Sequence, residues 1–272
     1  MEERQYIYIS NDAFQIVVSD GKDIENLKIL DSRPFNPELS LLRNFEEFIY
    51  DNPSVLTLNR PTDVLVDFFP APLLPGNAET KNTAALLDLA WPTSDSEVAW
   101  QVFPVKGIED LDVALRLEKP LTRFMQRSFY PLAYHWALEG LIRRWHQEAK
   151  DDTLRRRPFS LHVQWDKDHI YMGLFKSNGR LIAAPAYYIA ASPDNIKYYI
   201  TKTADSLFDN PEDDLSVCLY GRQDDIEQVK PFLDNGGLHV FTPKLSYRSS
   251  FKTFVEDSRD INVCLKAYLC EI

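Results

Sequence analysis

Residues 5–20 read QYIYISNDAFQIVVSD, and residues 160–182 read SLHVQWDKDHIYMGLFKSNGRLI. In each stretch, two runs rich in β-branched and aromatic residues flank a short polar turn, which is the pattern of an antiparallel strand hairpin. Because the same hairpin opens two well-separated parts of the chain, we expect two related halves.

Each hairpin leads into a similar series of elements. In the first half we expect strands at 5–9, 13–18, 24–30, 55–58 and 97–105, an extended piece at 122–127, and helices at 36–49, 108–117 and 131–150. The buried side of the helix at 131–150 would carry Leu132, Trp136, Leu141 and Trp145. The proline-rich stretch 68–76 is predicted to be a loop, since proline lacks the amide donor.

In the second half the expected strands lie at 161–165, 170–175, 181–189, 215–219 and 238–241, and the expected helices at 193–207, 224–233 and within 251–269.

Composition indicates an ordinary folded protein with an acidic surface. The 272 residues are 44% hydrophobic and include 13 Tyr, 16 Phe and 5 Trp against only 9 Gly. The net charge of −11 opposes binding to nucleic-acid phosphates or to anionic lipid surfaces. The one compact basic run, Arg155–Arg157, is interpreted as a solvated linker.

Cysteine content and hydropathy indicate the cellular compartment in which we expect the protein. Cys218, Cys264 and Cys270 form no CxxC pair, and their odd number favours a reducing environment. The amino terminus has no basic, apolar signal, and the longest apolar stretch, 181–191, is broken by Pro185. We therefore expect a cytoplasmic protein that is not itself inserted in a membrane.

The order of three strands, helix, strand, helix, strand resembles a ribonuclease H-like domain. Two such domains in tandem make the actin, Hsp70 and sugar kinase architecture, an α/β fold with mixed five-stranded sheets flanked by helices. The stretches 97–141 and 192–241, the latter with PDNIKYYI at 193–200 and VCLYG at 217–221, are similar to the actin-like domains of PilM-like and GspL-like proteins. The chain also looks like a bacterial family of unknown function with an actin-like ATPase fold. The resemblance implies a first lobe at 1–155 and a second at 156–272.

The resemblance also implies where nucleotide would bind. The residues that fall on its loops are Tyr8, Ser10 and Gln15 in the first phosphate loop, Gln164 and Asp166 in the second, and Gly221 and Arg222 in the adenosine loop. Tyr8 and Gln164 replace carboxylates that would hold the metal, Ser10 and Asp166 replace glycines, and Gln15 replaces a lysine. Because phosphoryl transfer needs a metal ion and a clamp for the developing charge, we expect no catalytic residue, no metal and no cofactor.

Two histidine groups offer other chemistry. His135, Glu139 and His146 would share one side of the helix at 131–150, as a metal site or as a solvated stripe. His162, Asp166, Asp168 and His169 cluster near the second hairpin turn, where a metal-dependent hydrolase would place ligands or a general base. Hydrated turn residues are the alternative interpretation.

The remaining clue is aromatic. Tyr187, Tyr188, Tyr198 and Tyr199 form adjacent pairs, and the members that reach the surface are candidate anchors for a protein partner. The leading hypothesis is a non-catalytic interaction or scaffold module that binds an unidentified protein. The alternative is a nucleotide-binding or ATP-hydrolysing enzyme with rearranged loops.

Overall fold

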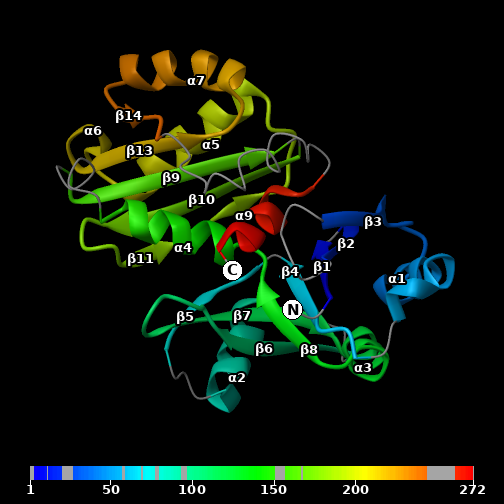
Figure 1. The fold of residues 1–272 in the computed structure, drawn as a ribbon. Coiled ribbons are helices and arrows are strands. Elements are labelled where there is room, and N and C mark those ends of the chain that lie inside the picture. Colours follow the sequence, from blue (N-terminus) through cyan, green and yellow to red (C-terminus); the bar gives the residue numbers. More distant parts are fainter. Residues whose placement is uncertain are drawn as a thin grey trace. The chain divides into compact units, whose positions relative to one another are not determined.

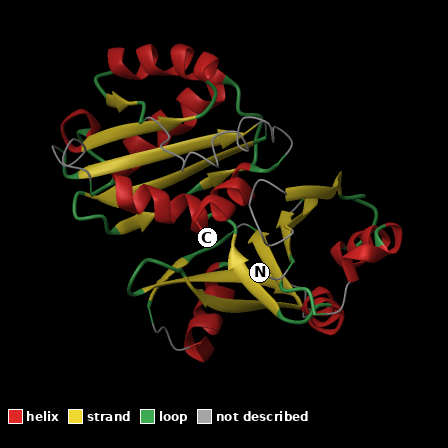
Figure 2. Cartoon of the chain, viewed as in Figure 1, coloured by secondary structure: helices red, strands yellow, loops and turns green. Residues whose placement is uncertain are grey.

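The computed structural model describes residues 3–10, 12–19, 27–56, 59–68, 70–76, 80–92, 97–150, 157–166, 168–243 and 261–271. The chain forms two compact units, residues 1–140 with 247–270, and residues 141–246. Both contain helices and strands (Figure 2), and no described helix is long and apolar enough to cross a membrane.

The first unit is built on a five-stranded sheet in the order β3-β2-β1-β4-β8. Its strands are β1 (Arg4–Ser10), β2 (Ala13–Ser19), β3 (Leu27–Pro34), β4 (Thr62–Asp67) and β8 (Leu132–Trp136). The hairpin β1–β2 and the pair β2–β3 are antiparallel, whereas β1 runs parallel to β4 and β4 parallel to β8. This order and these directions are those of a ribonuclease H-like sheet, as predicted.

Aromatic packing covers one face of this sheet. α1 (Leu41–Asp51) begins after Ser40, whose hydroxyl accepts a hydrogen bond from the Arg43 amide, and α3 (Lys119–Ser128) packs beside it. The Phe14 ring lies 4.6 Å from that of Phe48 and 5.9 Å from that of Phe45, both from α1. This contact joins the hairpin to the helix through three buried rings.

A small subdomain is inserted between β4 and β8. It consists of β5 (Leu73–Pro75), α2 (Thr80–Ala90), β6 (Val98–Pro104) and β7 (Leu111–Glu118), with the strands in the order β5-β7-β6. Leu87, Trp100 and Ala114 form its own small core.

The second unit repeats the sheet order as β11-β10-β9-β13-β14, with β12 paired to β10 (Figure 1). Its strands are β9 (Phe159–Asp166), β10 (His169–Lys176), β11 (Leu181–Ala183), β12 (Ala186–Tyr187), β13 (Leu215–Tyr220) and β14 (His239–Phe241). β9 is antiparallel to β10 and parallel to β13, which is parallel to β14. Each unit therefore contains one ribonuclease H-like sheet, and the two together make the tandem fold.

Strand alternation gives the second sheet one apolar face and one face that combines polar and aromatic side chains. Leu161, Val163 and Trp165 of β9 join the core beneath α5 (Pro193–Leu207) and α7 (Gln223–Asn235). A short helix, α6 (Pro211–Asp214), follows α5. On the opposite face, His162 lies against Trp145 of α4 (Glu139–Glu148), with ring centroids 6.1 Å apart.

The last helix of each half packs with the other half. Residues of α4 from Leu141 onward belong to the second unit, although they follow β8 of the first. α9 (Val263–Glu271) follows the second sheet but packs on the first, where Tyr268 lies 6.5 Å from the Tyr6 ring. The predicted lobes of 1–155 and 156–272 divide the chain by sequence and stay a prediction. The two compact units differ from that division because α4 packs in the second unit and α9 in the first.

Four predicted elements in the first half are wrong. Residues 108–117 form most of β7 rather than a helix, because Val113, Leu115 and Leu117 are buried with a period of two. Residues 122–127 lie in α3 rather than in an extended piece. Residues 53–56 form a 3-10 helix, so the next strand begins at Thr62. Part of the predicted loop 68–76 forms β5, a short edge strand that tolerates proline.

The predicted helix at 131–150 is also wrong, because it is two elements. Leu132–Trp136 is strand β8, paired in parallel with β4, and the helix begins only at Glu139. Leu132 and Trp136 therefore do not share a buried side with Leu141 and Trp145. Pairing with a neighbouring strand overrides the local helical spacing. In the closing segment, 251–260 lies outside the described residues.

Candidate functional site

The turn between β1 and β2 is closed by its own serine. The Ser10 hydroxyl donates to an Asp12 carboxylate oxygen at 2.5 Å, and it accepts from the backbone amides of Ala13 at 3.1 Å and Asp12 at 3.4 Å. Free amides in such a turn are what a phosphate would bind. Here two of those amides already have an acceptor, and the Asp12 carboxylate adds negative charge.

Tyr8 and Gln15 face the same side of the first sheet as a register pair. The Tyr8 hydroxyl donates to a carboxylate oxygen of Asp67 at 2.5 Å, and both side chains are buried. The Gln15 side-chain oxygen accepts from the Asn262 amide at 3.0 Å, just before α9 begins. Gln15 therefore holds the start of a helix at the position where a lysine would meet phosphate.

In the second unit, an indole ring lies against the predicted adenosine loop. A Cβ atom at Gly221 would lie 2.2 Å from Cε2 of Trp165, so this position requires glycine. The Trp165 Nε1 donates to Asp225 at 3.2 Å, and the Arg222 guanidinium donates to both oxygens of the same carboxylate, at 2.9 and 3.1 Å. The one glycine retained in this loop thus accommodates a tryptophan of the chain itself.

The remaining loop residues are also engaged in the protein. The Gln164 side chain donates to the Trp165 carbonyl at 3.4 Å and accepts from Arg144 at 3.4 Å. Asp166 ends β9 and is half-buried. The Arg222 side chain is 78% exposed, and its hydrogen bond with Asp225 raises the pKa of the guanidinium.

His135, Glu139 and His146 do not share a helix face. His135 lies on β8, and its Nε2 is 3.0 Å from Asp63 while its Nδ1 is 3.8 Å from Glu139. Burial lowers the pKa of His135, but hydrogen bonds to Asp63 and Glu139 raise it more, so the net direction is upward. The Nδ1 of His146 instead contacts the Gly179 carbonyl at 2.7 Å in the second unit.

His162 lies in a buried polar chain beneath α4. Its Nε2 is 3.1 Å from the Ser160 hydroxyl, its Nδ1 is 2.8 Å from the Tyr220 hydroxyl, and Tyr220 donates to Glu148. Burial, with the nearby Arg144 guanidinium, lowers the pKa of His162 to about 3. The ring is therefore neutral at pH 7, and its location fits an anchor for α4 better than a reactive group.

The second histidine group is brought together only in part, because Asp166 and His169 lie opposite each other at the end of the β9–β10 hairpin while His162 lies further along β9. His162 is fully buried in the polar chain, whereas the His169 ring stacks on Tyr171 with centroids 5.6 Å apart. Within the part of the chain that the structure describes, no three His, Cys, Asp or Glu side chains are placed to hold a metal ion.

The four tyrosines of the predicted partner surface differ in exposure. Tyr187 and Tyr199 stack with ring centroids 4.2 Å apart and pack against the second core. Tyr188 is half-buried and meets the edge of His169. Tyr198 is 57% exposed, and it is the member of the group that a partner can reach.

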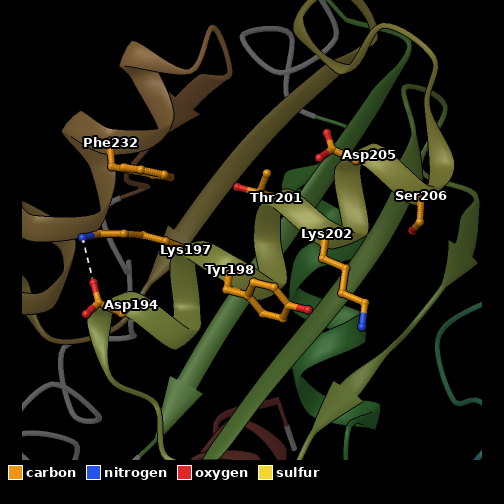
Figure 3. Close-up of a pocket in the computed structure, with 8 residues that line it drawn as sticks. All are labelled: Asp194, Lys197, Tyr198, Thr201, Lys202, Asp205, Ser206 and Phe232. Atoms are coloured by element: carbon orange, nitrogen blue, oxygen red, sulfur yellow. Dashed lines mark hydrogen bonds and ion pairs between the residues drawn. The ribbon is translucent and has the colours of Figure 1, made fainter.

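Tyr198 lines a groove on the outer side of α5 and α7 with a volume of about 730 Å³ (Figure 3). Phe232 of α7, which is 53% exposed, also lines it. The other lining residues come from α5 and are Asp194, Lys197, Thr201, Lys202, Asp205 and Ser206. Phe232 is not among the surface residues predicted from the sequence. A signal was present, because Ile226, Val229 and Leu233 form the buried stripe of α7 and Phe232 lies off it.

The sheets and their connections define an actin-like ATPase fold. The chain matches no protein-family model and no curated protein. It is similar to a solved structure from Bacteroides thetaiotaomicron, described as a protein with an actin-like ATPase fold and unknown function. The TM-score is 0.71, with 15% identity over 98% of this chain and 95% of that one.

Two further solved structures are more distant. One is the cytoplasmic domain of EpsL, an inner membrane component of the type II secretion system of Vibrio cholerae, with a TM-score of 0.40 and 11% identity over 99% of this chain and 94% of that one. The other is the PilM-PilN type IV pilus biogenesis complex, with a TM-score of 0.39 and 12% identity over 99% and 86%. The resemblance to an actin-like ATPase fold of unknown function is borne out at the level of the fold by the Bacteroides thetaiotaomicron structure alone.

Proposed function

We propose that this protein is a non-catalytic interaction module, a pseudo-ATPase that binds a protein partner and uses no nucleotide. The observation that carries this proposal is that the chain's own side chains occupy the loops on which the fold would bind nucleotide. The Ser10 hydroxyl accepts hydrogen bonds from two backbone amides of the first turn, and Trp165 lies directly against Gly221. Two amides of the first turn therefore already have an acceptor, and among the described residues no three His, Cys, Asp or Glu side chains are placed to hold a metal ion, which supports a site without the main sources of transition-state stabilisation for phosphoryl transfer.

The same proposal includes a reducing, cytoplasmic location and a partner other than nucleic acid. Cys218 is a buried free thiol, and the Cys264 side chain is buried as well. The net charge of −11 opposes association with phosphate backbones.

Mg-ATP and Mg-ADP should leave the melting temperature unchanged at millimolar concentration. A ligand that binds the native state at 100 times its dissociation constant would add about 2.7 kcal/mol to the free energy of unfolding, which a thermal shift assay detects easily. Isothermal titration calorimetry on the same samples provides the independent measurement. Saturable heat with micromolar affinity would refute the proposal.

A nucleotide-binding protein with rearranged loops is the second candidate, and one observation favours it. The Arg222 guanidinium is 78% exposed at the start of α7 and could attract an anion. If ATP binds, Arg222→Ala should abolish the titration signal, while Arg180→Ala, at another exposed arginine of the same unit, should leave it intact. Loss in Arg222→Ala alone would establish this second candidate.

A further inference from the structure

The groove between α5 and α7 presents two aromatic rings that the fold does not need for its core. Tyr198 and Phe232 are 57% and 53% exposed. They come from different helices, Tyr198 from α5 and Phe232 from α7, and both line the groove (Figure 3). Exposed large aromatic side chains gathered at a groove are the usual anchors of a protein interface.

Two lysines lie beside these rings, and one of them is paired with a carboxylate. Lys197 lies 3.4 Å from Asp194 and 5.4 Å from the centre of the Phe232 ring. Lys202 lies 5.7 Å from the centre of the Tyr198 ring. Asp205, also in the lining, is exposed and forms no ion pair with a described residue.

The charge of the molecule is concentrated in the segment that carries this groove. Residues 193–235, from the start of α5 to the end of α7, contain ten carboxylates and four cations, a net charge of −6 out of −11 for the whole chain. Of those cations, Lys197, Arg222 and Lys230 are each paired with a carboxylate. The segment therefore carries a negative potential that attracts cations.

We propose that this groove binds a basic amphipathic segment of the partner protein. An apolar face would insert between Tyr198 and Phe232, and lysine or arginine side chains would face Asp205 and the surrounding carboxylates. A second copy of this chain fits less well, because a two-fold interface would bring two acidic faces together. This inference rests on the proposed function and specifies the chemistry of the partner.

The test uses a fluorescein-labelled synthetic peptide with leucine and tryptophan on one helical face and lysine on the other. Fluorescence anisotropy should show saturable binding to the full chain that weakens as salt is added. Tyr198→Ala and Phe232→Ala should each weaken binding by about tenfold or more. Asp205→Lys should also weaken it. Because these side chains are exposed, the variants should melt near the wild-type temperature.

The control variant is Tyr50→Ala, which removes a ring that is 86% exposed in the first unit and should leave peptide binding unchanged. A peptide of the same composition with the apolar residues scattered should bind weakly, and so should a peptide with glutamate in place of every lysine. Equal binding of the scrambled or acidic peptide, or equal affinity of the Tyr198→Ala, Phe232→Ala and wild-type proteins, would overturn the inference. Self-association of the wild type in sedimentation, lost in Tyr198→Ala, would assign the groove to a second copy instead.

The two proposals fail separately. Binding of Mg-ATP would refute the proposed absence of nucleotide and leave the peptide result standing. If the basic peptide does not bind and nucleotide does not bind either, the proposed interaction module stands, but this groove is not its binding surface.

Discussion

At the scale of single residues, the pKa values of the two buried histidines are shifted in opposite directions, downward for His162 and upward for His135. In the second unit, burial and Arg144 lower the pKa of His162 to about 3. An unfolded chain takes up this proton below about pH 6.5, whereas the folded protein does not. His162 therefore has no effect on stability above that pH and removes stability as the pH falls from about 6.5 toward 3.

The variant His162→Gln should reduce the acid sensitivity of folding. The free energy of unfolding of the wild type should contain a contribution from His162 that falls by up to about 1.4 kcal/mol per pH unit below pH 6.5, and the variant should lack it. Urea unfolding between pH 5 and pH 8 measures both slopes. His239→Gln, at an exposed position of β14, is the matched control. A slope unchanged by His162→Gln would contradict the assignment of a neutral buried ring.

His135 provides the opposite sign. Although burial lowers its pKa, hydrogen bonds to Asp63 and Glu139 raise it above the ordinary value. Its contribution to stability is fully present below about pH 6.5 and is lost as the pH rises through the folded pKa. His135→Gln should therefore flatten the alkaline side of the same profile and leave its acid side as in the wild type.

At the scale of elements, the contact between β9 and the loop after β13 depends on Gly221. Gly221→Ala should lower the free energy of unfolding by about 1–3 kcal/mol or more, because the new Cβ would overlap the Trp165 indole. Gly236→Ala is the control, since its nearest neighbour, the Leu233 carbonyl oxygen, would be 3.4 Å away.

A double-mutant cycle tests whether the indole is the cause. The cost of Gly221→Ala should shrink markedly in a Trp165→Leu background, because the side chain that the new methyl group meets is then smaller. An equal cost in both backgrounds would mean that Gly221 is required for another reason. It would contradict the proposal that Trp165 fills the predicted adenosine loop.

At the scale of the whole molecule, the exchange of the last helices predicts which unit each helix stabilises. Tyr268 of α9 lies 5.0 Å from the His135 ring, and a Cβ at Gly140 would come within 2.4 Å of the Tyr268 amide nitrogen. Tyr268→Ala should cost about 3 kcal/mol, as is usual for a buried aromatic side chain.

Hydrogen exchange should place that loss in the first unit. Amides of β1, β4 and β8 should lose protection in Tyr268→Ala, while those of β9 and β13 should keep it, although Tyr268 lies near the carboxy terminus. Val229→Ala, in the buried stripe of α7, should give the reverse pattern. Loss of protection in β9 and β13 rather than in the first sheet would contradict the helix exchange.

The sequence by itself determined the two hairpins, the helices α5 and α7 and the strands β13 and β14 of the second half, and the repeated order that leads to the fold. Those features depend on local spacing: alternation in β9 and β10, and the helical stripe of α5, can be read from neighbouring residues. The replacements at Tyr8, Ser10 and Gln15 were equally visible, because each concerns the identity of one residue.

The tertiary structure alone decided four things: that Leu132–Trp136 is a strand, that α4 and α9 are exchanged, that Trp165 lies against Gly221, and that Phe232 and Tyr198 line one groove. Each depends on residues distant in the chain, because a segment with ambiguous periodicity takes the form that its packing partner allows. These packing contacts form only when the sheets assemble, so the pattern of neighbouring residues does not predict them.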